Sequence, residues 1–282
     1  MEAIIIKVIM ISVMFLMIGV GLNITISEVI DTLRQYKLIL IGVLANFIVI
    51  PIIGYIGLTY LPLEPYVKVG IMLMVAAPVA PMVPPFVAMA KGNVTYSVGL
   101  MVIIAVLSVF LTPLLLTISF PESIGGVLLN PMEIVKTLVM VQLIPITIGI
   151  LCSQFRSGWA KIMLKFVPKI GQIGLFIGVG FILAKQVSEI ISLGIIPHLV
   201  LILLVIVMII VGDLMLVRNA RKMRTSLAVS TAIRNVPLAF LIAGQNFPDT
   251  IVAPVVLIFS VYTMLLSIVY GKVMARKYLK EK

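Results

Sequence analysis

The stretch "AAPVAPMVPP" at residues 76–85 holds four prolines, Pro78, Pro81, Pro84 and Pro85, inside an otherwise apolar segment. A proline in a helix interior removes a backbone hydrogen bond and clashes with the preceding turn. So many prolines in so short a stretch predict that a helix entering it is interrupted. The role of such an interruption depends on whether water or lipid surrounds the helix.

Composition identifies that solvent as a lipid bilayer. Of 282 residues, 62% are apolar and 11% are charged, whereas a soluble domain carries about 25% charged residues. So few charges cannot cover a surface that faces water. The sequence therefore predicts an integral, all-α polytopic membrane protein.

Nine stretches are long enough to cross the hydrocarbon core, which takes about 20 apolar residues. They are 4–22, 38–60, 67–90, 94–118, 131–154, 168–186, 195–217, 226–244 and 250–271. The connections are short, which predicts one transmembrane domain over residues 1–282. The first stretch is interpreted as a true span and not a signal peptide, because it is long and no small-residue cleavage site follows.

The basic residues predict the orientation, because loops on the cytoplasmic side are rich in lysine and arginine. Alternate loops and the carboxyl-terminal tail hold 16 of the 21 basic residues, namely Arg34, Lys37, Lys91, Arg156, Lys161, Lys165, Lys169, Arg218, Arg221, Lys222, Arg224, Lys272, Arg276, Lys277, Lys280 and Lys282. The other loops hold mainly Glu64, Glu122, Glu189 and Asp249. We expect a cell-membrane protein with its amino terminus outside and its carboxyl terminus in the cytoplasm. The net charge of +11 therefore reflects the membrane topology. It does not indicate a nucleic-acid partner, and none is expected.

An internal repeat is suggested by "IGVGL" at 18–22 and "IGVGF" at 177–181, which lie 159 residues apart. The same offset carries Pro78 onto Pro237 in "STAIRNVPLAF" and lays the first four spans over the last four. This pattern predicts two inverted repeats, a first at 1–120 that lacks its first helix and a second at 130–282. The paired glycines Gly19, Gly21, Gly178 and Gly180 are expected to allow close helix packing.

Paired interruptions at membrane depth point to a binding site. Irregular backbone is tolerated there only where protein buries it or where it lines a cavity, and broken helices in both halves of an inverted repeat mark a transporter's site. The alternative is a proline kink that only aids packing. We expect residues 78–85 and 231–237 to be non-helical and in contact near mid-membrane.

Four stretches resemble one known family, the bile acid:sodium symporters. They are "IGVLANFIVIP" at 41–51, "AKGNVTYSV" at 90–98, "PMEIVKTLVMVQLIPITIGIL" at 131–151 and "STAIRNVPLA" at 230–239. The resemblance covers nearly the whole chain. It implies an inverted repeat of five helices, a panel and a core domain, and two broken helices that cross in the core. Some members have nine helices because the first is missing.

The resemblance also implies where sodium would bind, and the residues there are mostly unsuited to it. Val83 and Pro84 stand where the family has a Ser-Asn pair, and Met101 replaces a hydroxyl ligand while Ser97 keeps one. Sodium is a hard cation and prefers several oxygen ligands, as hard cations do. These positions predict a scaffold that has lost its sodium chemistry, so sodium as a bound cofactor is doubtful.

The second broken helix departs from the family in the same way. Ser230 stands in place of the shared glutamate and Arg234 in place of the neighbouring glutamine. Asn46 replaces another glutamine, and Asn235 matches the asparagine that contacts substrate in the family.

Arg234 is the residue of greatest interest, because an arginine near the bilayer centre must face the protein interior and find a partner. Three candidates are the carbonyls at the helix ends, Asp213 on the preceding span, and a substrate anion. Our hypothesis is that Arg234 stands in for sodium inside a polar pocket completed by Asn46, Ser97, Ser230, Thr231 and Asn235. The alternative is that Arg234 forms a structural ion pair with Asp213. Asp213 is also a candidate for proton coupling, or its side chain could extend to the basic loop at the membrane surface.

The sequence therefore favours a secondary transporter of a small organic anion that works by alternating access without sodium. The alternatives are a sodium-coupled symporter that uses backbone ligands, and a membrane binder or sensor that does not transport. No nucleophile-elbow or metalloprotease string is present, so no enzyme activity is expected. His198 has no second histidine at ligand spacing, so no metal site is expected.

Overall fold

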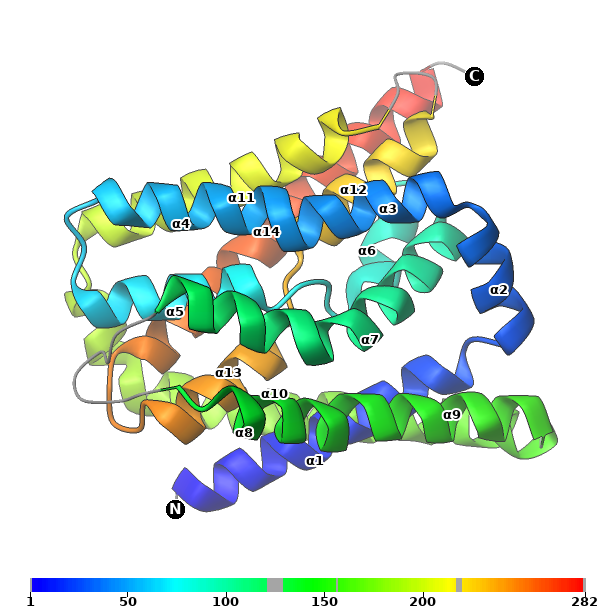
Figure 1. Cartoon of the computed structure of the whole chain (residues 1–282), viewed down its shortest axis with the longest axis horizontal. Helices are drawn as coiled ribbons and strands as arrows, with labels where there is room; N and C mark the ends of the chain where they lie inside the picture. Colours follow the sequence, from blue (N-terminus) through cyan, green and yellow to red (C-terminus); the bar gives the residue numbers. More distant parts are fainter. Residues whose placement is uncertain (1, 121–128, 156, 217–219, 281–282) are drawn as a thin grey trace.

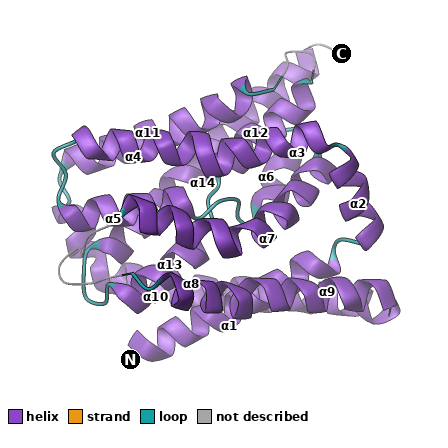
Figure 2. Ribbon diagram, in the orientation of Figure 1, coloured by secondary structure: helices purple, strands orange, loops and turns teal. Residues whose placement is uncertain are grey.

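A computed structural model describes residues 2–120, 129–155, 157–216 and 220–280 of the protein. Within these residues the chain is helical throughout, with short loops and no strand (Figure 2). The helices are α1 (Glu2–Leu22), α2 (Ile26–Arg34), α3 (Tyr36–Leu44), η1 (Ala45–Val49), α4 (Ile50–Tyr60), α5 (Pro65–Ala76), α6 (Val83–Met89), α7 (Val94–Ser119), α8 (Pro131–Leu138), η2 (Val139–Leu143), α9 (Ile144–Phe155), α10 (Ser157–Ser192), α11 (Ile195–Leu214), α12 (Arg221–Ala232), α13 (Val236–Asn246) and α14 (Val252–Lys280). The two elements labelled η are π-helical turns.

Eight apolar helical segments in the described residues have the length and hydropathy to cross a membrane. They are Ile4–Leu22, Tyr36–Tyr60, Val94–Ser119, Pro131–Phe155, Gly158–Ile182, Ile195–Leu214, Arg221–Asn246 and Val252–Leu279. The remaining predicted span, 67–90, is divided between α5 with 12 residues and α6 with seven. Neither piece is long enough to cross a membrane alone. Counted by helix length, the described residues therefore give eight spans and not the predicted nine.

The helices form two layers (Figure 1). One layer, which we call the panel, consists of α1, α8–η2–α9 and α10, and α1 packs against both of the others. The other layer, the core, contains α3 to α7 and α11 to α14, and α2 connects the two layers.

Glycines bring the panel helices close together. A Cβ at Gly21 would overlap the Ile146 carbonyl oxygen, one at Gly149 would overlap the Ile18 carbonyl oxygen, and Gly19 lies against Pro168. Gly178 similarly contacts Ile9, whereas a side chain at Gly180 would meet nothing within 4 Å. The predicted packing role therefore holds for three of the four paired glycines and fails for Gly180.

Several helices differ from their predicted bounds. Helix α10 begins at Ser157 and not at 168, and α14 continues to Lys280 and not to 271, so basic residues assigned to loops are helical. Lysine and arginine are good helix formers, and they are tolerated where a helix leaves the hydrocarbon. The span pattern missed α2 altogether, because this helix is short and amphipathic.

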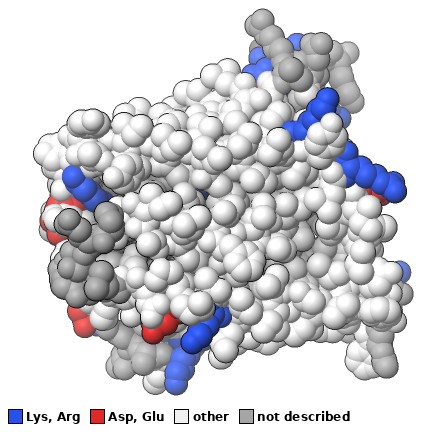
Figure 3. Space-filling view, in the orientation of Figure 1, with Lys and Arg blue, Asp and Glu red and all other residues white. Residues whose placement is uncertain are grey.

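Most charged side chains lie towards the two ends of the bundle, with a broad uncharged surface between them (Figure 3). We call one of these the basic end: it holds α2, the first turns of α10 and α12, and the carboxyl-terminal part of α14 (Figure 1). Glu122, Arg156, Arg218 and Lys282 lie outside the described residues. The distribution is that of a bundle whose middle faces lipid.

Candidate functional site

Two helices are interrupted in the core, and the interruptions touch each other. Helix α5 ends at Ala76 and α6 begins at Val83, while α12 ends at Ala232 and α13 begins at Val236. The Ala80 amide donates to the Ile233 carbonyl at 3.2 Å, and the Asn235 amide donates to the Ala77 carbonyl at 2.9 Å. We call these two segments, 77–82 and 233–235, the crossing.

Both non-helical segments are shorter than the predicted ranges of 78–85 and 231–237. Pro78 and Pro81 lie in the first interruption, but Pro84 and Pro85 belong to the first turn of α6, and Pro237 to the first turn of α13. A proline is tolerated there because the first amides of a helix have no intrahelical acceptor. These three prolines therefore begin the second half-helices and do not break the first ones.

The first interruption contains one residue with a strained backbone. Val79 has a φ angle of 32°, which is rare for a β-branched residue. Backbone of this kind is retained where the surrounding structure fixes it, and it clusters at functional sites.

The guanidinium of Arg234 lies at the crossing and is completely buried. Its Nε donates to the Met74 carbonyl at 3.1 Å, and its Nη2 donates to the neighbouring Val75 carbonyl. Its Nη1 donates to Asn46 Oδ1 at 2.7 Å and to the Thr231 carbonyl at 3.4 Å. Met74 and Val75 are in the last turn of α5, where the helix dipole gives a partial negative charge. The cation is thus held by four oxygen atoms without a carboxylate.

A π-helical turn places Asn46. Its Nδ2 donates to the Gly42 carbonyl at 2.9 Å, which leaves Oδ1 free to accept from Arg234. The turn η1 ends two residues before Pro51, which has no amide hydrogen to continue the α-helical pattern. The turn η2, which contains Gln142, ends two residues before Pro145 in the same way. Such turns are frequent at functional sites.

Asp213 is not the partner of Arg234, which corrects the ion pair considered as an alternative. Its Oδ2 forms an ion pair with Arg224 Nη2, its carbonyl accepts from Arg224 Nε at 2.7 Å, and its Oδ1 accepts from Tyr270 at 3.0 Å. Asp213 lies in the last turn of α11, towards the basic end, while Arg234 is directed at the end of α5. The carboxylate thus has a nearer cation than Arg234.

The predicted polar pocket around Arg234 is only partly assembled. Asn46 contributes its side chain and Thr231 its carbonyl, while the Thr231 hydroxyl donates to the Met208 carbonyl at 2.8 Å. The Ser97 hydroxyl donates to the Val94 carbonyl, and the buried Ser230 hydroxyl has no hydrogen-bond partner among the described residues. Asn235 Nδ2 donates to Gln142 Oε1 at 3.2 Å, so its side-chain amide bonds to the panel.

A cavity of about 470 Å³ opens between panel and core at the basic end, lined by parts of α1, α2, α6, α7 and α10. It reaches the first interruption at Pro81 and Met82 and extends along α7 to Met101. Arg234 and Asn235 do not line it. Of the described residues in its wall, Glu28 carries the one formal charge.

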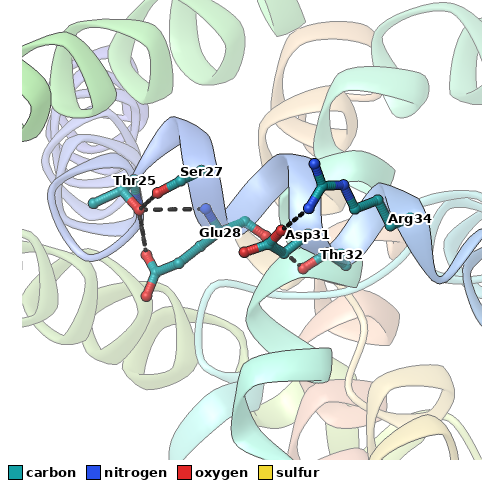
Figure 4. Close-up of polar contacts among 6 residues, drawn as sticks. All are labelled: Thr25, Ser27, Glu28, Asp31, Thr32 and Arg34. Carbon is teal, nitrogen blue, oxygen red and sulfur yellow. Dashed lines mark hydrogen bonds and ion pairs between the residues drawn. The ribbon is translucent and has the colours of Figure 1, made fainter.

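Glu28 of helix α2 lines this cavity, and Figure 4 shows its carboxylate directed at Thr25. Glu28 accepts from the Thr25 amide at 2.8 Å and from the Thr25 hydroxyl at 2.9 Å, and its own amide donates back to Thr25, which forms a capping box. Thr32 is buried against Gly99 of α7, so α2 is anchored to the core.

The sequence did not single out Gln142, although the structure gives it several buried contacts. Its side chain is 2% exposed and bonds to Ala105, Ser108 and Asn235. A signal was present, because an uncharged amide in an apolar span is expensive unless its hydrogen bonds are satisfied inside the protein.

The apolar helices define a multi-pass membrane protein, and comparison with known proteins specifies its family. Residues 10–193 match the Sodium Bile acid symporter family, and the chain belongs to that family. It is 26% identical over 186 residues to "Probable sodium/metabolite cotransporter BASS1, chloroplastic" from Oryza sativa subsp. japonica, covering 65% of this chain and 45% of that protein.

Two further relatives are similar at the same level. The chain is 24% identical over 189 residues to "Uncharacterized sodium-dependent transporter YocS" from Bacillus subtilis (strain 168), covering 67% of this chain and 58% of that protein. It is 23% identical to "Probable sodium/metabolite cotransporter BASS3, chloroplastic" from Oryza sativa subsp. japonica, covering 91% of this chain and 62% of that protein. The chain thus spans about half the length of the relatives that it matches, and these are named as transporters and not as enzymes.

Proposed function

We propose that this protein is a secondary transporter that carries a small organic solute by alternating access and is not coupled to sodium. The observation that carries the proposal is the complete burial of Arg234 in the crossing, with its donors on the carbonyls of Met74, Val75 and Thr231 and on Asn46. A fixed guanidinium there supplies the positive charge that a bound cation would supply.

This arrangement favours transport that is not coupled to sodium over a sodium symporter with backbone ligands. The carbonyls at the end of α5 are the backbone oxygens that such a symporter would offer to sodium, and the guanidinium already occupies them. A second cation at the same oxygens would meet strong repulsion from Arg234. The proposal therefore assigns to Arg234 the part that sodium plays in relatives named as sodium cotransporters.

Alternating access is supported by the two layers and by the cavity between them at the basic end. The cavity opens at the basic end, which the distribution of lysine and arginine assigns to the cytoplasm, so we interpret the state as inward-facing. In this proposal residues 1–120 and 130–282 are inverted repeats of one transmembrane domain, each with one interrupted helix. The protein lies in the cell membrane with its amino terminus outside.

The first substrate class to test is the small organic anion. Lys165 and Lys169 lie within one turn of Pro168 of the cavity wall, and basic residues near an opening would raise the local concentration of anions, although Glu28 in the wall would oppose this. The buried Arg234 does not face the cavity. Recognition in this state would therefore fall to the hydroxyl and amide groups of Thr95, Asn23 and Gln172, which line it.

Two measurements test the proposal. A thermal-shift screen of carboxylates with purified protein would identify a ligand, and uptake of that ligand into proteoliposomes would then be measured in sodium and in potassium. The proposal expects saturable uptake at the same rate in both salts. Strict sodium dependence would overturn the coupling assignment, and ligand binding without uptake would point to a binder or sensor.

A further inference from the structure

Gln142 is a panel residue whose hydrogen-bonding partners all belong to the core. Its Nε2 donates to the Ala105 carbonyl at 2.6 Å and to the Ser108 hydroxyl at 2.7 Å, both on α7. Its Oε1 accepts from Asn235 Nδ2 at 3.2 Å, and Asn235 belongs to the crossing. One buried side chain therefore ties the panel both to α7 and to the crossing.

These contacts lie directly beyond the deep end of the cavity. Val94, Val98 and Met101 of α7 line the cavity, and Ala105 and Ser108 continue the same helix face at the next two turns. At 1.5 Å per residue they lie about 6 Å and about 10 Å past Met101. The amide of Gln142 thus lies one to two turns of α7 beyond the cavity.

The layers are packed together on the far side of Gln142. Between α1, α10, α13 and the start of α14 a void of about 70 Å³ remains, lined by Ile5, Phe240 and Ala253 among others. This is a small fraction of the cavity at the basic end. A cavity of about 690 Å³ also lies at this far end, but it is bordered by core helices and loops, and Ser192 is the one residue of a panel helix in its described lining. Between panel and core, the interface is therefore open on one side of Gln142 and nearly filled on the other.

We propose that Gln142 is the latch that holds this closed side shut, and that the transport cycle requires its bonds to Ala105, Ser108 and Asn235 to break. The inference rests on the proposed alternating access. While the interface is dry, breaking the bonds would leave buried polar groups unpaired, which is costly. When the closed side opens, water can take over each bond, so the latch can release without leaving an orphaned donor or acceptor.

The latch also connects the closed side to the crossing. Asn235 Oδ1 accepts from the Leu238 amide at the start of α13, and the Asn235 amide donates to the Ala77 carbonyl of the other interruption. A ligand that moves Asn235 would therefore weaken the bond to Gln142. These bonds connect the crossing directly to Gln142.

Cysteine accessibility tests the latch without a known substrate. In a Cys152→Ser background, Ala253→Cys reports on the closed side and Thr95→Cys on the cavity, each labelled with a water-soluble maleimide. Gln142→Leu should raise the labelling rate of Ala253→Cys about tenfold, because a small population with an open far side grows as the latch is lost. Thr95→Cys should remain reactive, since the cavity-open state still predominates.

The matched control is Gln154→Leu, the same change on an exposed residue of the same span, and it should leave both rates unaltered. If Gln142→Leu does not fold, Ser108→Ala removes one partner of the latch and should raise the Ala253→Cys rate by a smaller factor. An unchanged rate in folded Gln142→Leu, or in Ser108→Ala where Gln142→Leu does not fold, would overturn the latch. Because labelling needs no solute flux, an absence of uptake in proteoliposomes would count against the proposed function alone.

Discussion

Removing the guanidinium of Arg234 should turn the crossing into a sodium site. Arg234→Ala leaves the Met74, Val75 and Thr231 carbonyls and Asn46 Oδ1 around a space that the side chain had filled. Several oxygen atoms converging on one point are the ligands that hard cations prefer. The variant should therefore respond to sodium, while the unmodified protein should not.

The size of the effect follows from the contacts. The bonds to Met74, Val75 and Asn46 are charge-assisted, worth about 1.5–3 kcal/mol each, and their loss is partly offset because the cost of burying a charge disappears. We expect Arg234→Ala to lower the free energy of unfolding by about 2–4 kcal/mol in potassium. Sodium at about ten times its dissociation constant would restore about 1.4 kcal/mol, or roughly 3–6 °C in Tm by the scaling for domains of this size.

The assay is thermal unfolding in detergent, with NaCl compared to KCl at equal ionic strength. Arg234→Lys is the matched control, because it keeps a cation in the site and should show no difference between the salts. The reasoning is refuted if Arg234→Ala is as indifferent to sodium as the unmodified protein, since the carbonyl cluster would then not be a cation site.

Two further predictions concern stability. Gly149→Leu should destabilise the protein by about 3 kcal/mol, because the new side chain would overlap the backbone of α1. Gly180→Leu should be neutral, because no described atom lies within 4 Å of a Cβ at that position. Thermal unfolding of both variants checks this, and equal losses of stability would contradict it. Asp213→Asn should lower the free energy of unfolding by about 1–2 kcal/mol, because it weakens the contacts with Arg224 and Tyr270. The Arg234 site should stay intact, so thermal unfolding of this variant should not depend on sodium. A response to sodium would contradict the separation of the two sites.

The main features of the fold could be predicted from the sequence, because hydropathy and proline act locally. Apolar runs of about 20 residues identify spans directly, and the prolines at 78 and 81 mark a real interruption. Proline alone could not give the limits of each break, because it also starts helices, as Pro84 and Pro237 do. Helix α2 was missed because a short amphipathic helix has no span signal.

The site was less predictable, because its partners are set by packing over long sequence separations. That Arg234 is buried follows from its position in a span, but its contacts with Met74 and Asn46 join residues 160 and 188 positions apart. Whether Asp213 pairs with Arg234 or extends towards the basic loop depended on which way the guanidinium of Arg234 turns at the crossing. Gln142 was overlooked because its partners are on other helices and no motif contains them.

Sodium binding to the purified, unmodified protein tests most directly whether Arg234 occupies the cation site. Equilibrium binding of radioactive sodium needs neither a substrate nor a functioning transport cycle. We predict no saturable binding to the unmodified protein and saturable binding to Arg234→Ala under the same conditions. Saturable, stoichiometric sodium binding by the unmodified protein would contradict the assignment of Arg234 as a built-in replacement for the ion.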